Sequence, residues 1–195
     1  IKTYVDNWYK NNLTAYTKYI STEAVYCNDR ELASGSTYST GSSFNYAPYG
    51  RLATNKTPTY NCTNIKDAFS GSNSEAKLTY PIGLMTADEI AYVGGKNSTS
   101  LPSPYAWYYL NSAGGSITGS TAWWSLSPYY WNGSSSLVWI VFGSSRSGQL
   151  INLIVGNYLR GARPAISLKT CTLWTSGNGA PETPYEIILD SNISC

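Results

Sequence analysis

The stretch WWSLSPYYWNGSSSLVWIVFG, residues 123–143, decides the fold class of this chain. It consists of short runs of aromatic and β-branched residues broken by Gly, Ser and Asn, which is typical of strands joined by turns. The same pattern recurs in WYYL (107–110), QLINLIVGNYL (149–159), ARPAISLK (162–169) and PYEIILD (184–190). We therefore expect five or six short strands in the second half of the chain.

The first half of the chain carries helical signals. Apolar residues recur at steps of three and four over residues 1–20, which predicts an amphipathic helix. Thr86 followed by Glu89 is a capping-box pattern and predicts a short helix over 87–93. Between these helices, residues 28–75 lose all periodicity, which favours long ordered loops. Helices followed by a run of strands indicate an α+β fold with a small antiparallel sheet.

The composition excludes several classes of function. The 195 residues fit a single domain, 1–195, in which only 12% are charged and the formal net charge is +2. No run of Lys or Arg stands out, so we expect no nucleic-acid partner. The chain has no histidine, which removes Ser-His-Asp and Cys-His catalysis and histidine-ligated zinc or iron. No apolar run approaches the roughly 18–20 residues that cross a bilayer, so we expect no membrane insertion by this segment.

The uncharged residues give a positive signal. The chain has 18 Tyr and 7 Trp, and Ser, Thr, Asn and Gly are abundant. This mixture resembles antibody paratopes, in which Tyr supplies rigid contact area and Ser, Gly and Asn supply adaptable hydrogen bonds. The composition therefore favours binding over catalysis.

Cysteine spacing indicates an oxidising compartment. Cys27, Cys62, Cys171 and Cys195 form no C-x-x-C pair, so the spacing of zinc and redox sites is absent. The even count fits disulfides, and of three connectivities we favour the local one, Cys27–Cys62 and Cys171–Cys195, with buried free thiols as the alternative. We expect an extracellular or cell-surface protein whose signal peptide or anchor lies outside this segment, which opens with Ile1.

Several motifs in a fixed order carry a resemblance to a known family. They are YCNDR (26–30), LTYPIGLMTADEIAYVGG (78–95), W-x-L-S-P (124–128), G-x-L (148–150) and G-x-R-P-x-I-x-L-K (161–169). Over essentially the whole chain, the sequence resembles bacterial extracellular modules of unknown function that are similar to the C-type lectin-like fold of the formylglycine-generating-enzyme type. The resemblance implies two helices and a small antiparallel sheet with long ordered loops.

The motifs that hold metals in related folds are missing from this chain. The formylglycine-generating enzymes bind a metal cofactor through paired cysteines, and nothing here matches that active site. Sugar-binding C-type lectins use E-P-N or W-N-D calcium motifs, whereas Trp131 and Asn132 are followed by Gly133. Calcium needs clustered oxygen ligands with several carboxylates, which this region lacks. We therefore expect no cofactor and no metal.

The resemblance also implies a candidate variable region. In some bacteria and phages, diversity-generating retroelements rewrite adenines in a C-terminal stretch of this fold and leave the scaffold intact. Here that stretch would run from Trp123 to Arg163. Rewriting the adenines of an Asn codon never yields Trp, so Trp123, Trp124, Trp131 and Trp139 would belong to the fixed frame. Because Trp is usually buried, we also expect core positions for Trp107, Trp123, Trp124 and Trp139.

The candidate ligand-binding residues lie in a loop expected after Pro128, in a turn before Gln149, and on the strand and loop that follow. They combine aromatic anchors, an Arg and small polar side chains, the residue types from which interface hot spots are made. The candidates are Tyr129, Tyr130, Asn132, Ser134, Ser135, Ser144, Ser145, Arg146, Asn152, Asn157 and Tyr158. The alternative interpretation is that they are solvated loop residues and core tyrosines.

These observations favour a non-enzymatic binding module, displayed on a bacterial or phage surface, whose partner is a protein or glycan ligand on another cell or host surface. One alternative is a carbohydrate-active or peptide-modifying enzyme whose acidic pair would be Asp29 and Glu31. Another is an architectural module of a surface adhesin. The capping box already explains Asp88 and Glu89. We expect Arg163 to be structural and bonded to a carboxylate such as Asp88 or Asp29.

Overall fold

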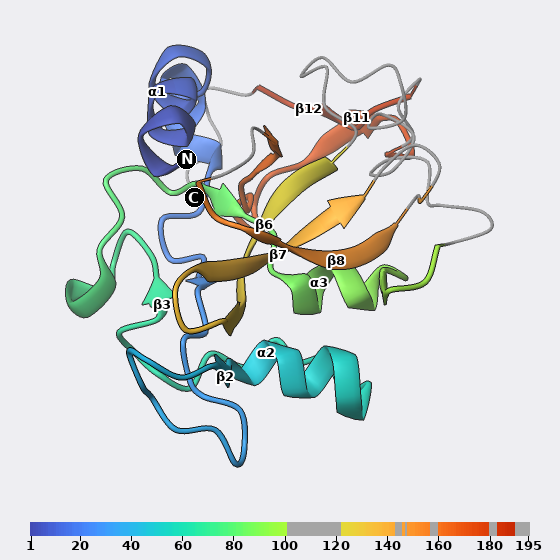
Figure 1. The fold of residues 1–195 in the computed structure, drawn as a ribbon. Helices are drawn as coiled ribbons and strands as arrows, with labels where there is room; N and C mark the ends of the chain where they lie inside the picture. Colours follow the sequence, from blue (N-terminus) through green and yellow to red (C-terminus); the bar gives the residue numbers. More distant parts are fainter. Residues whose placement is uncertain (101–121, 143–145, 147, 157–159, 180–182, 190–195) are drawn as a thin grey trace.

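The computed structural model describes residues 1–100, 122–142, 146, 148–156, 160–179 and 183–189. Within these residues, helices surround a curled, mostly antiparallel sheet, with smaller two-stranded sheets beside it (Figure 1). The helical segments are α1 (Lys2–Asn12), η1 (Thr14–Tyr19), α2 (Ala47–Tyr49), η2 (Gly50–Asn55), η3 (Ser74–Ala76) and α3 (Ala87–Tyr92). The strands are β1 (Tyr26–Cys27), β2 (Phe44–Asn45), β3 (Ala68–Phe69), β4 (Gly83–Leu84), β5 (Lys96–Asn97), β6 (Ala122–Trp131), β7 (Ser136–Phe142), β8 (Gln149–Ile154), β9 (Gly161–Ala162), β10 (Pro164–Ala165), β11 (Trp174–Ser176) and β12 (Glu186–Ile187). The α+β class is confirmed.

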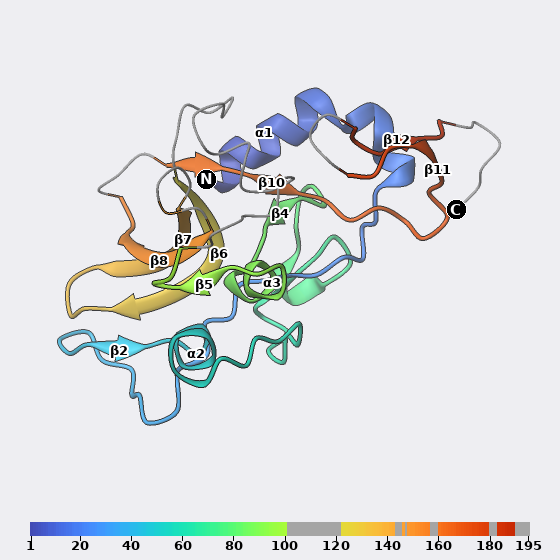
Figure 2. The ribbon, with the colours of Figure 1, turned by 90° about the vertical axis from the view of Figure 1, so that its right-hand side faces the viewer.

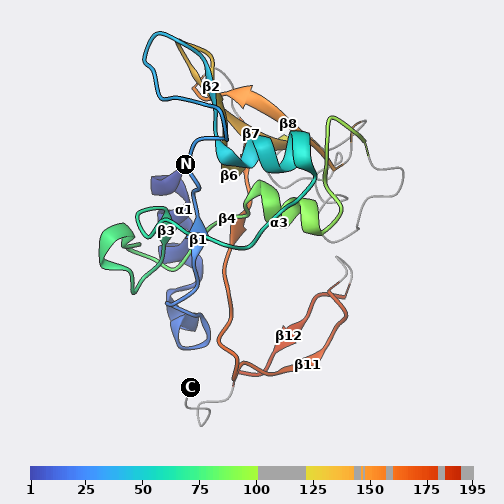
Figure 3. The same cartoon turned by 90° about the horizontal axis from the view of Figure 1, so that it is seen from below.

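The main sheet is built around β6, β7 and β8, which are the strands expected from the aromatic runs. Its strand order is β2-β6-β7-β8-β5, and β9 also pairs with β6. The pairs β2–β6, β6–β7 and β7–β8 are antiparallel, whereas β5 pairs with β8 and β9 pairs with β6 in parallel. The expected strand WYYL (107–110) lies outside the described residues. Figure 3 shows the β11–β12 hairpin lying apart from the main sheet.

The core lies on both faces of this sheet. Successive residues of a strand point to opposite faces, and Trp123 and Trp124 accordingly enter different clusters. Trp123 packs with Trp139 and Leu52 on the side of α2 and α3, and Trp124 packs on the side of α1 (Figure 2). The expectation that Trp123, Trp124 and Trp139 are core residues is therefore confirmed. Trp107 lies outside the described residues.

The N-terminal helix is shorter than the apolar pattern predicts. The α-helix α1 ends at Asn12, and residues 14–19 continue as a 3₁₀ helix. At this point the side chains of Asn12 and Thr14 donate to the carbonyls of Trp8 and Lys10, four residues earlier. Such side-chain bonds compete with the helical backbone pattern, which gives a physical reason for the change.

The capping-box helix is confirmed. The Glu89 amide donates to Thr86 Oγ1 at 3.0 Å, and Glu89 Oε2 accepts from the Thr86 amide at 2.7 Å. The helix α3 runs from Ala87 to Tyr92, one residue shorter than the sequence predicts. Its Ala87 and Ile90 are fully buried, which fixes the helix against the sheet.

Residues 28–75 contain the long ordered loops that the composition predicts, but they also hold a helix that it missed. The helix α2 leads directly into the π-helix η2, so residues 47–55 form one helical segment. Pro48 and Gly50 weaken any helical signal in this stretch. Leu52 is buried in the cluster around Trp139, so tertiary packing stabilises the segment.

The disulfide Cys27–Cys62 is confirmed and closes the loop between β1 and the segment before β3. Cys195, the expected partner of Cys171, lies outside the described residues. No helix in the described part of the chain is long and apolar enough to span a bilayer.

Candidate functional site

The structure corrects the position of Tyr129 and Tyr130, which lie in strand β6 and not in a loop after Pro128. Two neighbouring strands hold this end of β6, because Tyr130 opposes Leu137 of β7 and Asn45 of β2. The ladder between β6 and β7 is irregular on both sides of Pro128, which is how a sheet accommodates a residue without an N–H donor.

Tyr129 and Asn152 belong to a half-buried cluster on the α2 side of the sheet. The Tyr129 ring meets the edges of Trp139 and Tyr49, with ring centroids 4.6 and 5.1 Å apart. Asn152 pairs with Trp139 in the β7–β8 ladder and hydrogen-bonds to Tyr129. Burial, and then the nearby Tyr49, raise the pKa of the Tyr129 hydroxyl, and the bond to Asn152 opposes this shift. Both side chains therefore pack within the fold, beside Trp139.

Asn132, Ser134 and Ser135 form the tip of the β6–β7 hairpin. Asn132 Oδ1 accepts from the amides of Ser134 and Ser135, at 3.0 and 2.7 Å, and from the Ser134 hydroxyl. Gly133 between them has a φ of +93°, a conformation that favours glycine. Asn132 and Ser134 are exposed and Ser135 is half-buried, and the hydrogen bonds within the tip hold it in one shape.

A second polar segment lies beside this tip and was not singled out as a binding site from the sequence. Strand β2 pairs Phe44 with Trp131, and a Cβ placed on Gly133 would lie 3.6 Å from the carbonyl oxygen of Gly41. Tyr38 packs its ring against Phe44, with centroids 5.5 Å apart, yet remains 69% exposed. We call the set Tyr38, Ser39, Ser42, Asn132, Ser134 and Ser135 the hairpin surface. The composition of STYSTGSS, residues 36–43, was the available signal for its first half.

The other predicted binding residues are not brought to this surface by the described structure. Arg146 is exposed, and its guanidinium lies 5.6 Å from the centre of the Phe142 ring. Ser144, Ser145, Asn157 and Tyr158 lie outside the described residues.

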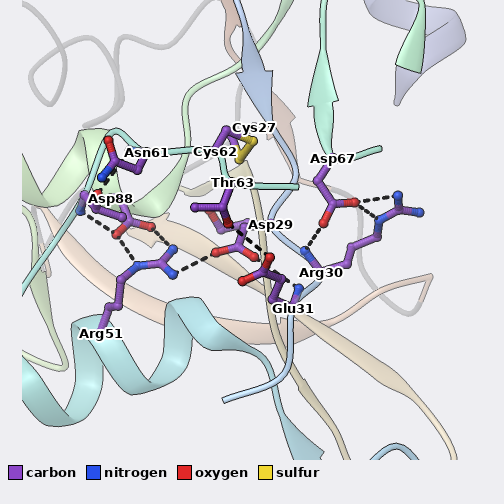
Figure 4. A network of polar contacts seen from close by, with 12 residues as sticks. Cys27, Asp29, Arg30, Glu31, Arg51, Asn61, Cys62, Thr63, Asp67 and Asp88 are labelled. Atoms are coloured by element: carbon purple, nitrogen blue, oxygen red, sulfur yellow. Dashed lines mark hydrogen bonds and ion pairs between the residues drawn. A yellow bond between two sulfur atoms is a disulfide. The ribbon is translucent and has the colours of Figure 1, made fainter. Parts of the chain in front are cut away.

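A partly buried ion-pair network lies between η2, α3 and the loop after β1 (Figure 4). Arg51 on η2 donates through Nε and one terminal nitrogen to Asp88, at 2.9 and 3.0 Å. Its other terminal nitrogen donates to Asp29 at 2.7 Å. The Thr59 amide donates to Asp88 Oδ1 at 3.0 Å and adds a fourth segment. The network therefore joins parts of the chain that are distant in sequence.

The expected partner of the two carboxylates is wrong. Asp29 and Asp88 bind Arg51, whereas the guanidinium of Arg163 lies 4.4 Å from the centre of the Trp123 ring. Arg163 thus stacks on a core aromatic residue. Burial by itself would lower the pKa of Arg51, but the hydrogen bonds and charges of Asp88 and Asp29 outweigh it and raise that pKa.

Asp29 and Glu31, the acidic pair of the enzyme alternative, both have structural partners. Asp29 Oδ1 accepts from the Glu31 amide at 3.1 Å, and its other oxygen accepts from Arg51. Glu31 accepts from the Thr63 hydroxyl at 3.0 Å on the protein surface. These contacts tie the loop after β1 to the loop that carries Cys62.

A small cavity of about 60 Å³ opens beside the ion-pair network. Its walls come from β1 and the residues on either side of it, η2, the loop before β3, the start of α3 and β6. The lining residues are Val25, Cys27, Asp29, Arg51, Thr59, Tyr60, Asn61, Thr86, Asp88, Glu89 and Ser127. No pattern in the sequence groups these residues, because they come from five separate segments.

Comparisons of this chain with known proteins find no relative. Among the described residues, no cluster of three or more His, Cys, Asp or Glu side chains could hold a metal ion. No family model, no curated protein and no solved structure matches the chain.

Proposed function

We propose that this chain is a non-enzymatic binding module that presents the hairpin surface to a protein ligand. One observation carries the proposal: two Ser/Gly-rich segments that are far apart in the sequence, 36–43 and 132–135, lie side by side through the pairing of β2 with β6. Their side chains have the composition of a paratope, with the exposed ring of Tyr38 as the aromatic anchor.

Rigidity supports the same proposal. Ser39 Oγ accepts from the amides of Gly41 and Ser42, and Asn132 Oδ1 organises the neighbouring tip in the same way. A surface that is ordered before binding loses less conformational entropy when a ligand arrives. We choose a protein as the ligand because hairpin tips form a protruding surface, whereas small molecules are usually bound in concave sites.

The location and the finer fold belong to this proposal too. The Cys27–Cys62 disulfide favours an oxidising compartment, and we propose display outside the cell or on a phage. Short helices on both faces of a curled sheet, together with long ordered loops, support a C-type lectin-like fold. Superposition of an experimental structure on known folds of that class would test this assignment.

Binding arrays test the function directly. The wild-type chain is applied to an array of purified cell-surface proteins and, in parallel, to a glycan array. We expect a protein ligand whose affinity falls at least tenfold in Tyr38→Ser and in Ser134→Arg, because truncating an aromatic anchor or adding bulk at the tip removes the contact. Tyr4→Ser is the matched control, since Tyr4 is 61% exposed on α1. Three results would overturn the proposal: equal binding by all variants, binding to glycans alone, or no binding on either array.

We further propose that a retroelement diversifies part of the region from Trp123 to Arg163. Much of this region forms the central strands, and Trp139, Val141 and Leu150 within it are fully buried. Substitutions should therefore concentrate at solvent-exposed Tyr, Ser and Asn codons and avoid these core positions. Sequencing the locus in closely related isolates measures this, and an even scatter of substitutions over the region would contradict diversification.

A further inference from the structure

We propose that the cavity beside Asp29, Asp88 and Tyr60 binds the guanidinium or ammonium group of an Arg or Lys side chain presented by a partner protein. This site is separate from the hairpin surface, because no residue of that surface lines the cavity. The proposal rests on the size of the cavity, its charge and the aromatic side chain that it exposes.

The size favours a small head group. A cavity of about 60 Å³ is several times larger than the roughly 10–15 Å³ that a single water molecule needs. A guanidinium or ammonium group fits such a volume, and the rest of the side chain would extend through the open mouth.

The charge favours a cation. Three carboxylates, Asp29, Asp88 and Glu89, line the cavity together with one cation, Arg51, which leaves a formal charge of −2. The nitrogens of Arg51 already donate to Asp29 and Asp88. Glu89 uses Oε2 for the capping box, and no donor from the described residues contacts its Oε1. The cavity therefore offers acceptors and negative charge to an incoming donor.

The exposed tyrosine pair provides an aromatic surface at the same place. Tyr60 lines the cavity, is 67% exposed and stacks on Tyr92 with centroids 4.2 Å apart and rings inclined by 13°. The Tyr92 hydroxyl donates to the Pro58 carbonyl at 2.7 Å, and this hydrogen bond fixes the Tyr92 ring on which Tyr60 stacks. Tyr rings attract cations at their faces, and Arg guanidinium groups stack on them.

The walls of the cavity are held in place before any ligand arrives. The Cys27–Cys62 disulfide ties the two loops that carry Asp29 and Tyr60. Figure 4 shows this disulfide together with Asp29 and Asn61. Arg51 joins the first loop to α3, and the Thr59 amide joins the second loop to Asp88. A single side chain makes few contacts and binds weakly. A preformed site lowers the entropic penalty of that binding.

A chemical-shift titration by NMR tests the site with defined probes. N-acetyl-arginine methylamide and the matching lysine and citrulline compounds are added to the ¹⁵N-labelled chain. Citrulline has nearly the shape of arginine without its charge. We expect saturable shifts at residues 59–61 and 88–89 with the two cationic probes, at least fivefold weaker affinity for citrulline, and weakening by added salt.

Two variants and one control make the result specific. Glu89→Gln removes a charge but keeps a capping-box residue, and Tyr60→Leu removes the ring from an exposed position. Each should weaken the arginine probe at least threefold, whereas Tyr4→Leu on α1 should leave its affinity unchanged. Equal affinity for arginine and citrulline, shifts that neither variant affects, or no saturable shift at these residues would overturn the proposal.

Discussion

An Arg51→Met variant will unfold with a free energy about 3–5 kcal/mol below that of the wild-type chain. Arg51 is the shared partner of Asp29 and Asp88, and the Asp88 side chain is only 4% exposed. Without the guanidinium, the Asp88 carboxylate keeps the Thr59 amide but loses its charge partner. Removal of one partner of a buried ion pair costs far more than the pair contributes, because an uncompensated charge stays buried.

Reversible denaturation in urea, followed by circular dichroism, measures this loss. Lys2→Met is the matched control, because Lys2 and Asp6 form an exposed pair on α1 and should contribute about 0.5 kcal/mol or less. Combining Arg51→Met with Asp29→Asn and Asp88→Asn removes the stranded charges and should recover part of the stability. A loss below about 1 kcal/mol in Arg51→Met would show that the network does not hold these segments together.

Removing the Cys27–Cys62 disulfide by Cys27→Ala with Cys62→Ala will lower the free energy of unfolding by about 3–4 kcal/mol. The two residues are separated by 35 positions, and the disulfide restricts that long segment in the unfolded chain. In the folded chain it also holds the loop whose Thr59 amide contacts Asp88. Removal of the disulfide should therefore also weaken the ion-pair network.

The same denaturation experiment tests the disulfide, with Thr40→Ala as the control. Thr40 is exposed and lies within the segment that the disulfide closes, so its truncation should change the stability by no more than about 0.5 kcal/mol. Because the disulfide and Arg51 hold the same loops, the combined variant should lose less stability than the sum of its parts. Strict additivity would mean that the two features act on independent parts of the chain.

Local signals in the sequence were sufficient for the capped helix and for the central strands. The helix α3 follows from the Thr86–Glu89 capping box, whose bonds join residues three positions apart. The strands β6, β7 and β8 follow from their aromatic and β-branched runs. By contrast, β2 and the π-helix η2 carry weak local propensity and exist because the sheet and Leu52 stabilise them. The sequence could not predict those elements.

The partner of a charged side chain depends on distant backbone positions. The sequence indicated that Asp88 or Asp29 would bind an arginine, and it suggested Arg163 because of the neighbouring proline. The structure places Arg51 at both carboxylates, since η2 packs beside α3, and it places Arg163 on Trp123. Composition identifies which residue types can pair, but only the packing of helices against the sheet decides which arginine lies beside the two carboxylates.

The candidate sites show the same division. The sequence by itself determined the strand-forming runs, the capped helix, the cysteines available for disulfides and the Tyr-, Ser- and Asn-rich composition, because these depend on neighbouring residues or on residue type alone. The tertiary structure decided that Tyr129 supports the core, that Tyr38 lies beside the hairpin tip, and that a cavity forms between Asp29, Asp88 and Tyr60. These features depend on contacts between distant segments, which no single stretch of sequence encodes.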